Sequence, residues 1–263
     1  MRLSNSRPIR DQYARMNNKD KSAGQGKCVR CGQCCEKGGP AFHLEDRSLI
    51  DSGAIPTRDI YTIREGEPVY DNIKGDFLFA ETDIIKIKGR PKPFSNLHFV
   101  CLFFEAKKKA CKIYEKRPLE CRVMKCGDTE GIREVYYRHR LVRKDMLKNI
   151  KGLWDIVKDH QSRCSYERLK IFLKVLDDGK NRDAMNGLLD IVSYDENLRI
   201  VVSQRSNVDF EITDFLFGRP VSFAMKMFGL KVRKLEGKYI LSSAKPIIGL
   251  EKQCRPLDGV TKI

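Results

Sequence analysis

The spacing of apolar residues changes near residue 130. Before that point, apolar residues come in short runs, some alternating with polar residues, and glycines and prolines separate the runs. Such runs are typical of short strands joined by frequent turns. A short helix is predicted at 44–50, and a short helical segment begins near Pro118. Strands are predicted at 77–79, 83–88, 98–103 and 110–114, with residues 89–91 ending the second and a lysine-rich turn at 107–109.

After residue 130 the apolar period becomes helical. Residues three or four positions apart lie on the same face of a helix, so a stripe at this spacing predicts helix packed on a core. Further helices are predicted at 166–176, 183–192 and 214–227. The segments 230–235 and 238–242 flank Glu236-Gly237, a two-residue turn typical of a β-hairpin. The stripe consists of Val135, Val142, Met146, Ile150, Leu153 and Val157.

Ten cysteines in a chain of 263 residues give the first chemical signal. The N-terminus has basic residues but no apolar stretch of the kind an export signal needs, which predicts a cytoplasmic location. A reducing cytoplasm keeps thiols free, and clustered cysteines there are more often metal ligands than disulfide partners. No run approaches the roughly 20 apolar residues of a membrane-spanning helix, so no membrane span is predicted.

The first cysteine group is the segment CVRCGQCC at residues 28–35. Two cysteines separated by two residues can turn both sulfur atoms toward one metal ion. Gly32 permits the tight turn and the close N–H···S approach that such loops need. Cys28, Cys31 and Cys34 also have the spacing with which ferredoxin loops hold three corners of a cubane cluster. Both arrangements need further ligands from elsewhere in the chain.

A second group supplies such ligands from residues 101–126. Its four cysteines lie at intervals of ten, ten and five positions. Neighbouring strands lie about 4.8 Å apart, so a short meander brings several of these thiols together. The two adjacent cysteines of the first group are expected to face different partners, and Cys164 and Cys254 stand apart from both groups. The predicted metal ligands are Cys28, Cys31, Cys34, Cys35, Cys101, Cys111, Cys121 and Cys126.

The two groups together resemble a known family. The CxxCGxCC segment at 28–35, followed by CKIYEKRPxxCR at 111–122, is similar to the CxxCxxCC cysteine-cluster family of YkgJ-type zinc- or iron-chelating domains. That family includes the flagellin lysine N-methylases. The resemblance covers roughly residues 25–130, and it implies that the eight cysteines named above are the family's cysteine positions.

Thiolate ligands suit both zinc and iron–sulfur clusters. A structural zinc site usually shows two paired CxxC knuckles. Only the first knuckle is present here, and the distal thiols are widely spaced. An iron–sulfur cluster, of the 4Fe–4S type, is therefore the predicted cofactor, with Zn²⁺ as the alternative.

The patterns combine into an α+β fold. An irregular, cysteine-rich, metal-organised module with short strands is followed by a mainly helical region that ends in a β-hairpin. Residues 1–27 are polar and basic and are predicted to be a flexible lead-in. Residues 28–130 form the cysteine-cluster, metal-binding module. Residues 131–263 form the helical region, to which the sequence assigns no function.

The chain carries 51 Lys and Arg against 35 Asp and Glu, a formal net charge of +16. This excess suits an acidic protein partner, nucleic acid or an anionic surface. The charge is spread along the whole chain, which favours a solvated lysine-rich surface over nucleic-acid binding. A protein partner is compatible with either interpretation.

Three functions stay open on the sequence alone. The leading one is a metal-centre protein with a redox, sensing or structural role. The second is a protein-modifying enzyme similar to the lysine N-methylases, and the third is a basic interaction module with a structural zinc site. No strand followed by a glycine-rich turn marks a nucleotide or S-adenosylmethionine site, so the methylase activity is not carried over.

Overall fold

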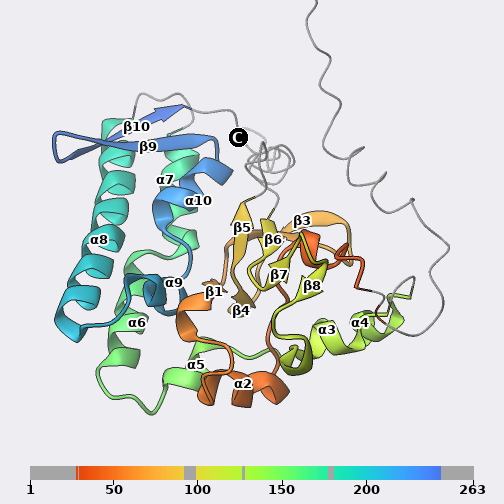
Figure 1. Cartoon of the computed structure of the whole chain (residues 1–263). Coiled ribbons are helices and arrows are strands. Elements are labelled where there is room, and N and C mark those ends of the chain that lie inside the picture. Colours follow the sequence, from red (N-terminus) through yellow and green to blue (C-terminus); the bar gives the residue numbers. More distant parts are fainter. Residues whose placement is uncertain (1–27, 29, 92–98, 126–127, 177–180, 244–263) are drawn as a thin grey trace, which may run out of the picture.

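The computed structural model describes residue 28 and residues 30–91, 99–125, 128–176 and 181–243. The predicted lead-in at 1–27, together with Cys126 and Cys254, lies outside these ranges. Within them, short antiparallel strands form the N-terminal half, helices follow, and a hairpin closes the chain (Figure 1). The predicted α+β class is confirmed.

The described strands pair two by two, each pair antiparallel. The β1–β4 pair is the most buried of them, with Ile60 opposite Ile87 and Ile63 opposite Ile84. These β-branched residues suit a pleated surface that packs on a core. The pairs are β1 (Ile60–Ile63) with β4 (Ile84–Ile87), β2 (Pro68–Asp71) with β3 (Asp76–Phe79), β5 (Gly89–Pro91) with β6 (Phe99–Cys101), β7 (Phe104–Glu105) with β8 (Ala110–Cys111), and β9 (Leu230–Leu235) with β10 (Lys238–Ser243).

The strand predictions hold with two corrections. Residues 89–91 do follow the end of β4, but they form a strand of their own that pairs with β6. The strands predicted at 98–103 and 110–114 are shorter in the structure, because tight turns take up their second halves. The closing hairpin is as predicted. Glu236 and Gly237 have φ values of 48° and 79°, and a two-residue turn with both centres left-handed matches the twist of its strands.

Helices dominate the second half, and the longest of them is α8. Ser165 and Asn181 cap α7 and α8 by accepting hydrogen bonds from the backbone N–H groups of Arg168 and Ala184. The α-helices are α2 (Arg47–Asp51), α3 (Leu119–Val123), α4 (Glu130–Val135), α5 (Arg143–Leu147), α6 (Leu153–Arg163), α7 (Tyr166–Val175), α8 (Arg182–Ser206), α9 (Thr213–Phe217) and α10 (Val221–Met227). Short 3₁₀ turns are η1 (Cys35–Lys37), η2 (Leu44–Asp46), η3 (Thr57–Asp59), η4 (Tyr114–Lys116) and η5 (Phe210–Ile212).

The apolar stripe between 135 and 157 is not one continuous face. It runs over α4, α5 and α6, which are separated by turns at His139 and Gly152 with φ values of 47° and 77°. Ile150 falls between two of these helices and is 49% exposed. A helical period in the sequence can therefore pass through breaks that only the backbone conformation reveals.

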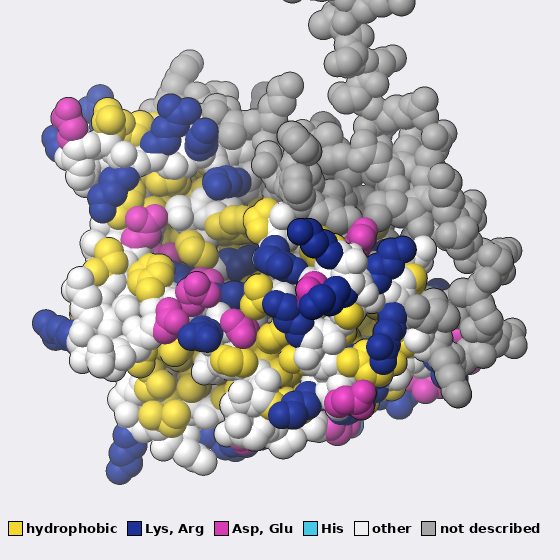
Figure 2. Space-filling model, in the orientation of Figure 1, with side chains coloured by type: hydrophobic (Ala, Val, Ile, Leu, Met, Phe, Trp, Pro, Cys, Tyr) yellow, Lys and Arg dark blue, Asp and Glu magenta, His cyan; other side chains and the backbone are white. Residues whose placement is uncertain are grey.

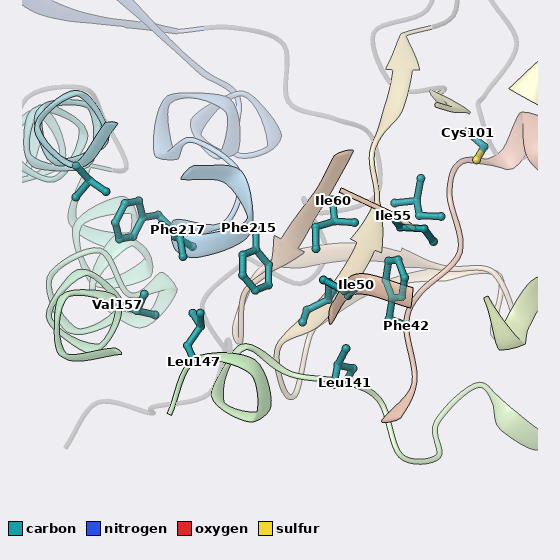
Figure 3. Packing of buried hydrophobic residues seen from close by; sticks show 14 of the residues in the cluster. Phe42, Ile50, Ile55, Ile60, Cys101, Leu141, Leu147, Val157, Phe215 and Phe217 are labelled. Carbon is teal, nitrogen blue, oxygen red and sulfur yellow. The ribbon is translucent and has the colours of Figure 1, made fainter. Parts of the chain in front are cut away.

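One hydrophobic cluster joins the strand-rich half to the helices. It contains Phe42 and Ile60 from the first half and Leu147, Val157 and Phe217 from the second (Figure 3). Trp154, the only tryptophan of the chain, packs against the same cluster. Because apolar burial is the main stabilising term in folding, the two halves share much of their stability.

Buried polar contacts reinforce this junction. The Arg143 guanidinium donates two hydrogen bonds to the Asp83 carboxylate, at 2.7 and 2.9 Å, and a third to the Leu216 carbonyl at 2.8 Å. The Thr62 hydroxyl donates to the Phe215 carbonyl at 2.7 Å. These bonds hold α5 and α9 against the β1–β4 pair. Among the described residues, no helix is both long and apolar enough to cross a membrane.

Candidate metal centre

The first cysteine loop lies directly on the strands that carry the second cysteine group. Gly32 has a φ of 85°, and a Cβ added there would lie 2.3 Å from the end of the Phe104 ring. Phe104 is paired across the β7–β8 ribbon with Cys111. The 3₁₀ turn η1, which begins at Cys35, packs against β6, which ends at Cys101. Two groups separated by more than sixty positions in the sequence thus become neighbours.

Gly39 fixes the other end of this loop. A Cβ added at Gly39 would lie 2.3 Å from the carbonyl oxygen of Ile87 and 2.7 Å from its Cβ. The obstacle includes backbone of a buried strand, which cannot move aside as the tip of a side chain can. Only glycine allows the loop to come this close to β4.

Replacing Gly39 with alanine is therefore expected to push the cysteine loop off β4. Overpacking of this kind costs about 1–3 kcal/mol of unfolding free energy, measured by urea denaturation. Metal content per chain should fall in the same variant, because the first cysteine group moves away from the second. Gly53→Ala is the control: a Cβ there meets nothing within 4 Å, so its cost is only the strain of alanine at a φ of 71°, and its metal content should not change. Equal losses of metal in the two variants would contradict the docking role of Gly39.

Five of the described cysteines lie near enough to influence one another's ionisation: Cys34, Cys35, Cys101, Cys111 and Cys121. Burial raises the pKa of Cys101, and the thiols of Cys111 and Cys34 raise it further. Burial also raises the pKa of Cys121 well above its usual value, with further contributions from Cys101 and Cys34. Thiols that oppose one another's ionisation in this way need a cation to become thiolates together.

The two adjacent cysteines behave differently. The pKa of Cys34 falls to about 6, chiefly because the Cys35 side chain hydrogen-bonds to it. The same hydrogen bond raises the pKa of Cys35, and burial raises it further. Cys34 is exposed, whereas Cys35 packs against the main hydrophobic cluster. One of the pair therefore faces solvent and the other faces the core.

The predicted cysteine ligands that the structure describes do not all converge on one position. Cys28 is half-buried and Cys31 is exposed on the loop that leads into η1, and Cys126 lies outside the described residues. In the part of the chain that the structure describes, no three of the predicted cysteines have their sulfur atoms all within 4.8 Å of one another. Cys164 lies in the helical half, in a separate hydrophobic cluster.

Arginines lie beside the thiols. The positive charge of Arg117 lowers the pKa of Cys34, and that of Arg90 lowers the pKa of Cys101. Backbone N–H groups act in the same direction, with Phe103 donating to the sulfur of Cys101. Cations and N–H donors around sulfur are the usual means by which a protein stabilises bound thiolates.

Two acidic residues that the sequence analysis did not single out hold α3, the helix of Cys121. The Glu120 carboxylate accepts a hydrogen bond from the Ala41 N–H at 2.7 Å, and the Asp46 carboxylate accepts one from the Leu119 N–H at 2.8 Å. Arg122 also reaches Asp46, at 3.4 Å. These partners are 73 to 79 positions apart in the chain, so no local pattern could have indicated them.

His43 completes this anchor. Its Nδ1 lies 2.7 Å from the Arg138 carbonyl, and its Nε2 lies 3.6 Å from Glu120. Burial disfavours the charged imidazole, but the nearby Glu120 carboxylate and the hydrogen bond to the Arg138 carbonyl outweigh it and raise the pKa of His43. His43 therefore links α3 to the chain after α4.

A second group of ligand-type residues lies in the helical half. His160, Cys164 and Asp195 are buried, and their ligand atoms all lie within 4.8 Å of one another. Both oxygens of Asp195 are already used: one accepts from Arg199 Nε at 3.0 Å and from His160 at 2.7 Å, the other from the Val221 N–H at 2.9 Å. A metal ion would have to displace these bonds beside a guanidinium group. The group fits a hydrogen-bonded core network better than a metal site.

The charge state of this network makes stability depend on pH. Burial lowers the pKa of His160 to about 4, against an ordinary value near 6.5, while Asp195 opposes the shift. Burial disfavours a charged Asp195, but the hydrogen bond from His160 and the charge of Arg199 keep its pKa below the ordinary value. His160 is thus neutral in the folded protein and donates to an ionised Asp195.

Acidification is expected to weaken the fold through His160. Between pH 6.5 and about 4 the unfolded chain binds a proton at His160 that the folded chain does not, so stability is lost as pH falls through this window. The loss is on the order of 3 kcal/mol over the window. Comparing unfolding free energies of wild type and His160→Gln at pH 7 and pH 5 isolates this contribution, since any pH dependence of a metal centre is common to both. Parallel profiles for the two proteins would rule it out.

Comparison with known families matches the first half of the chain. Residues 27–139 match the CxxCxxCC family, whose description reads "Putative zinc- or iron-chelating domain". The resemblance inferred from the sequence is confirmed over these residues, and the match supports a metal-binding role. No curated protein and no solved structure matches the chain.

Proposed function

We propose that the chain binds an iron–sulfur cluster through the cysteines that meet at the junction of the first loop, β6, β8 and α3. The observation that carries the proposal is the convergence of Cys34, Cys101, Cys111 and Cys121 from four separate segments of the chain. The match of residues 27–139 to zinc- or iron-chelating domains supports the metal-binding part. Cys28, Cys31, Cys35 and Cys126 are proposed as further ligands.

The donor set fits such a group. All the converging side chains offer sulfur, which suits zinc and iron–sulfur clusters and not the oxygen-preferring cations. Burial raises the pKa of Cys101 and of Cys121, so in the absence of a metal these thiols are neutral at pH 7. Metal binding would replace those protons, and its affinity would fall as the pH is lowered.

The choice of a cluster over a single zinc ion rests on the spacing of the ligands. A zinc site built from two CxxC knuckles takes both ligand pairs from tight loops. Here the second set comes one residue at a time, from β6, β8 and α3. An iron–sulfur cluster is wider than one ion and takes ligands at its corners, which suits thiols that approach from several elements.

The residues around the centre have distinct roles. Arg90 and Arg117 place positive charge beside Cys101 and Cys34 and so favour their thiolate forms. Asp46 and Glu120 hold the α3 helix, and Gly32 lets the loop approach Phe104. A bound cluster would supply one-electron redox chemistry. A cluster that exchanges no electrons would instead crosslink the loop to the strands through its bonds to cysteine sulfur.

Metal and sulfide analysis of protein purified without oxygen tests the proposal. Brown protein with broad absorbance near 400 nm and matching amounts of iron and acid-labile sulfide is the expected result. Colourless protein that contains zinc and no sulfide would reject the cluster but keep the metal centre. Protein with neither metal would reject both.

A further inference from the structure

Basic side chains gather around the cysteines. Figure 2 shows Lys and Arg concentrated over the region where Figure 1 places β5 to β8. Few acidic side chains interrupt them in that view. Six exposed side chains define this surface, called the basic rim below: Arg30, Arg90, Lys107, Lys109, Lys112 and Lys116.

Part of this charge serves the centre and its immediate surroundings. Arg90 acts on Cys101, and its guanidinium donates to the Phe104 carbonyl. The guanidinium groups of Arg30 and Arg117 lie 4.2 and 3.6 Å from the centre of the Tyr114 ring. These arginines are held by contacts within the module, and Arg90 and Arg117 act directly on cysteine sulfur.

The lysines of the rim are different. Across the described ranges, Lys107, Lys109, Lys112 and Lys116 form no ion pair with an acidic side chain, and Lys108 pairs with Glu105 at 3.0 Å. Elsewhere on the surface, helix α6 pairs its own cations internally, as Lys158 does with Asp155 at 2.8 Å. The rim thus places four lysines without an ion pair to any described residue within ten positions of one another in the chain, with one exposed acidic residue, Glu115, among them.

Keeping these lysines together has a cost. Like charges at the surface repel one another and lower stability. Lys109 also adopts a φ of 47°, a left-handed conformation that glycine or asparagine takes up more easily than lysine. A turn that needed only to reverse the chain would be easier to form with other residues at 107–109.

We infer that the basic rim docks an acidic protein surface over the cysteine centre. The inference rests on the proposed function for what lies at the middle of the surface, a metal centre that a docked partner would approach closely. Complementary charge around such a centre speeds encounter and orients the partner without requiring a large interface. Weak electron-transfer complexes have small interfaces of this kind.

The observations favour a protein over nucleic acid. Single strands bind through aromatic side chains on which bases stack, but Tyr114, beside the rim, is half-buried and its ring already lies against two guanidinium groups. Duplex DNA is read by helices or ribbons that enter a groove. The rim lies on β7–β8 and η4, whose elements are only two or three residues long.

The test measures binding of a fluorescein-labelled oligoglutamate peptide to the full chain by anisotropy, at low and rising salt. A triple variant, K107E/K109E/K112E, is compared with a control variant, K144E/K151E/K174E, which has the same net charge and alters exposed lysines of the helical half. The rim variant is expected to lose about tenfold in affinity and the control less than about threefold, because screened charges act over roughly 10 Å. Equal losses would overturn the inference.

A short DNA duplex and a single-stranded oligonucleotide serve as competing probes in the same assay. Tighter binding of either, with the same dependence on the rim lysines, would assign the surface to nucleic acid and overturn the protein partner. Metal content is measured on every variant. If the protein contains metal but the rim substitutions do not change its affinity for the peptide, this inference alone is rejected. If the protein contains no metal, the proposed function is rejected.

Discussion

Replacing Cys121 with serine is expected to abolish metal binding and to destabilise the strand-rich half of the chain. Cys121 is half-buried, lies on the helix that Asp46 and Glu120 anchor, and interacts with Cys34, Cys101 and Cys111. Even the loss of a hydrogen-bonding neighbour of a metal ligand costs about 10- to 100-fold in metal affinity, so the loss of a ligand should cost more. Metal analysis and urea denaturation, followed by circular dichroism, measure the two effects.

Cys164→Ser is the matched control. Cys164 is fully buried, and burial raises its pKa to about 12, so its thiol is neutral and takes no part in the thiolate group. Its sulfur lies 3.9 Å from the Ile191 carbonyl and 0% of its surface is exposed. The control should lose some stability but keep its metal. A Cys164 variant that lost metal as fully as the Cys121 variant would show that the ligands are wrongly divided.

The second large effect is expected at Asp195, which carries the polar network of the helical half. Asp195→Ala removes the acceptor of Arg199, His160 and the Val221 N–H at once. Arg199 is 1% exposed and would keep a buried charge, with Asp214 at 3.3 Å as its remaining acidic partner among the described residues. Breaking a buried pair from one side costs about 3–5 kcal/mol. Urea denaturation at pH 7 measures the loss of unfolding free energy.

An exposed ion pair is the control for this change. Asp51 pairs with Arg47 at 3.0 Å, and both side chains are about half exposed. Asp51→Ala should change the unfolding free energy by about 0.5 kcal/mol or less. If Asp195→Ala were equally mild, the Arg199 charge would have to be reaching solvent, and the network would not join α8 to α6 and α10 as described.

Local signals in the sequence were sufficient where the structure depends on neighbouring residues. The closing hairpin follows from Glu236-Gly237 between two strand-forming segments, and β3 and β4 follow from short apolar runs. The apolar spacing from 135 to 157 predicted a single helical stripe. It could not indicate the turns at His139 and Gly152, which divide this stripe among three helices. Apolar spacing thus predicts the kind of element better than its ends.

The candidate site divides in the same way. The cysteines could be identified by their spacing, since ligands must be chemically suited and suitably close. The residues that hold them, Asp46, Glu120 and Gly39, act through contacts with distant segments, and neither their type nor their position marks them in the sequence. The buried His160–Asp195 pair was missed for the same reason, because its partners come from different helices.

The shared hydrophobic cluster has a practical consequence. Cys101 belongs both to the thiol group and to the cluster against which the only tryptophan, Trp154, packs (Figure 3). The indole of Trp154 packs on the same cluster, so its emission reports on how that cluster is packed. Events at the cysteines can be followed optically without a label, with the chain serving as its own fluorescent sensor.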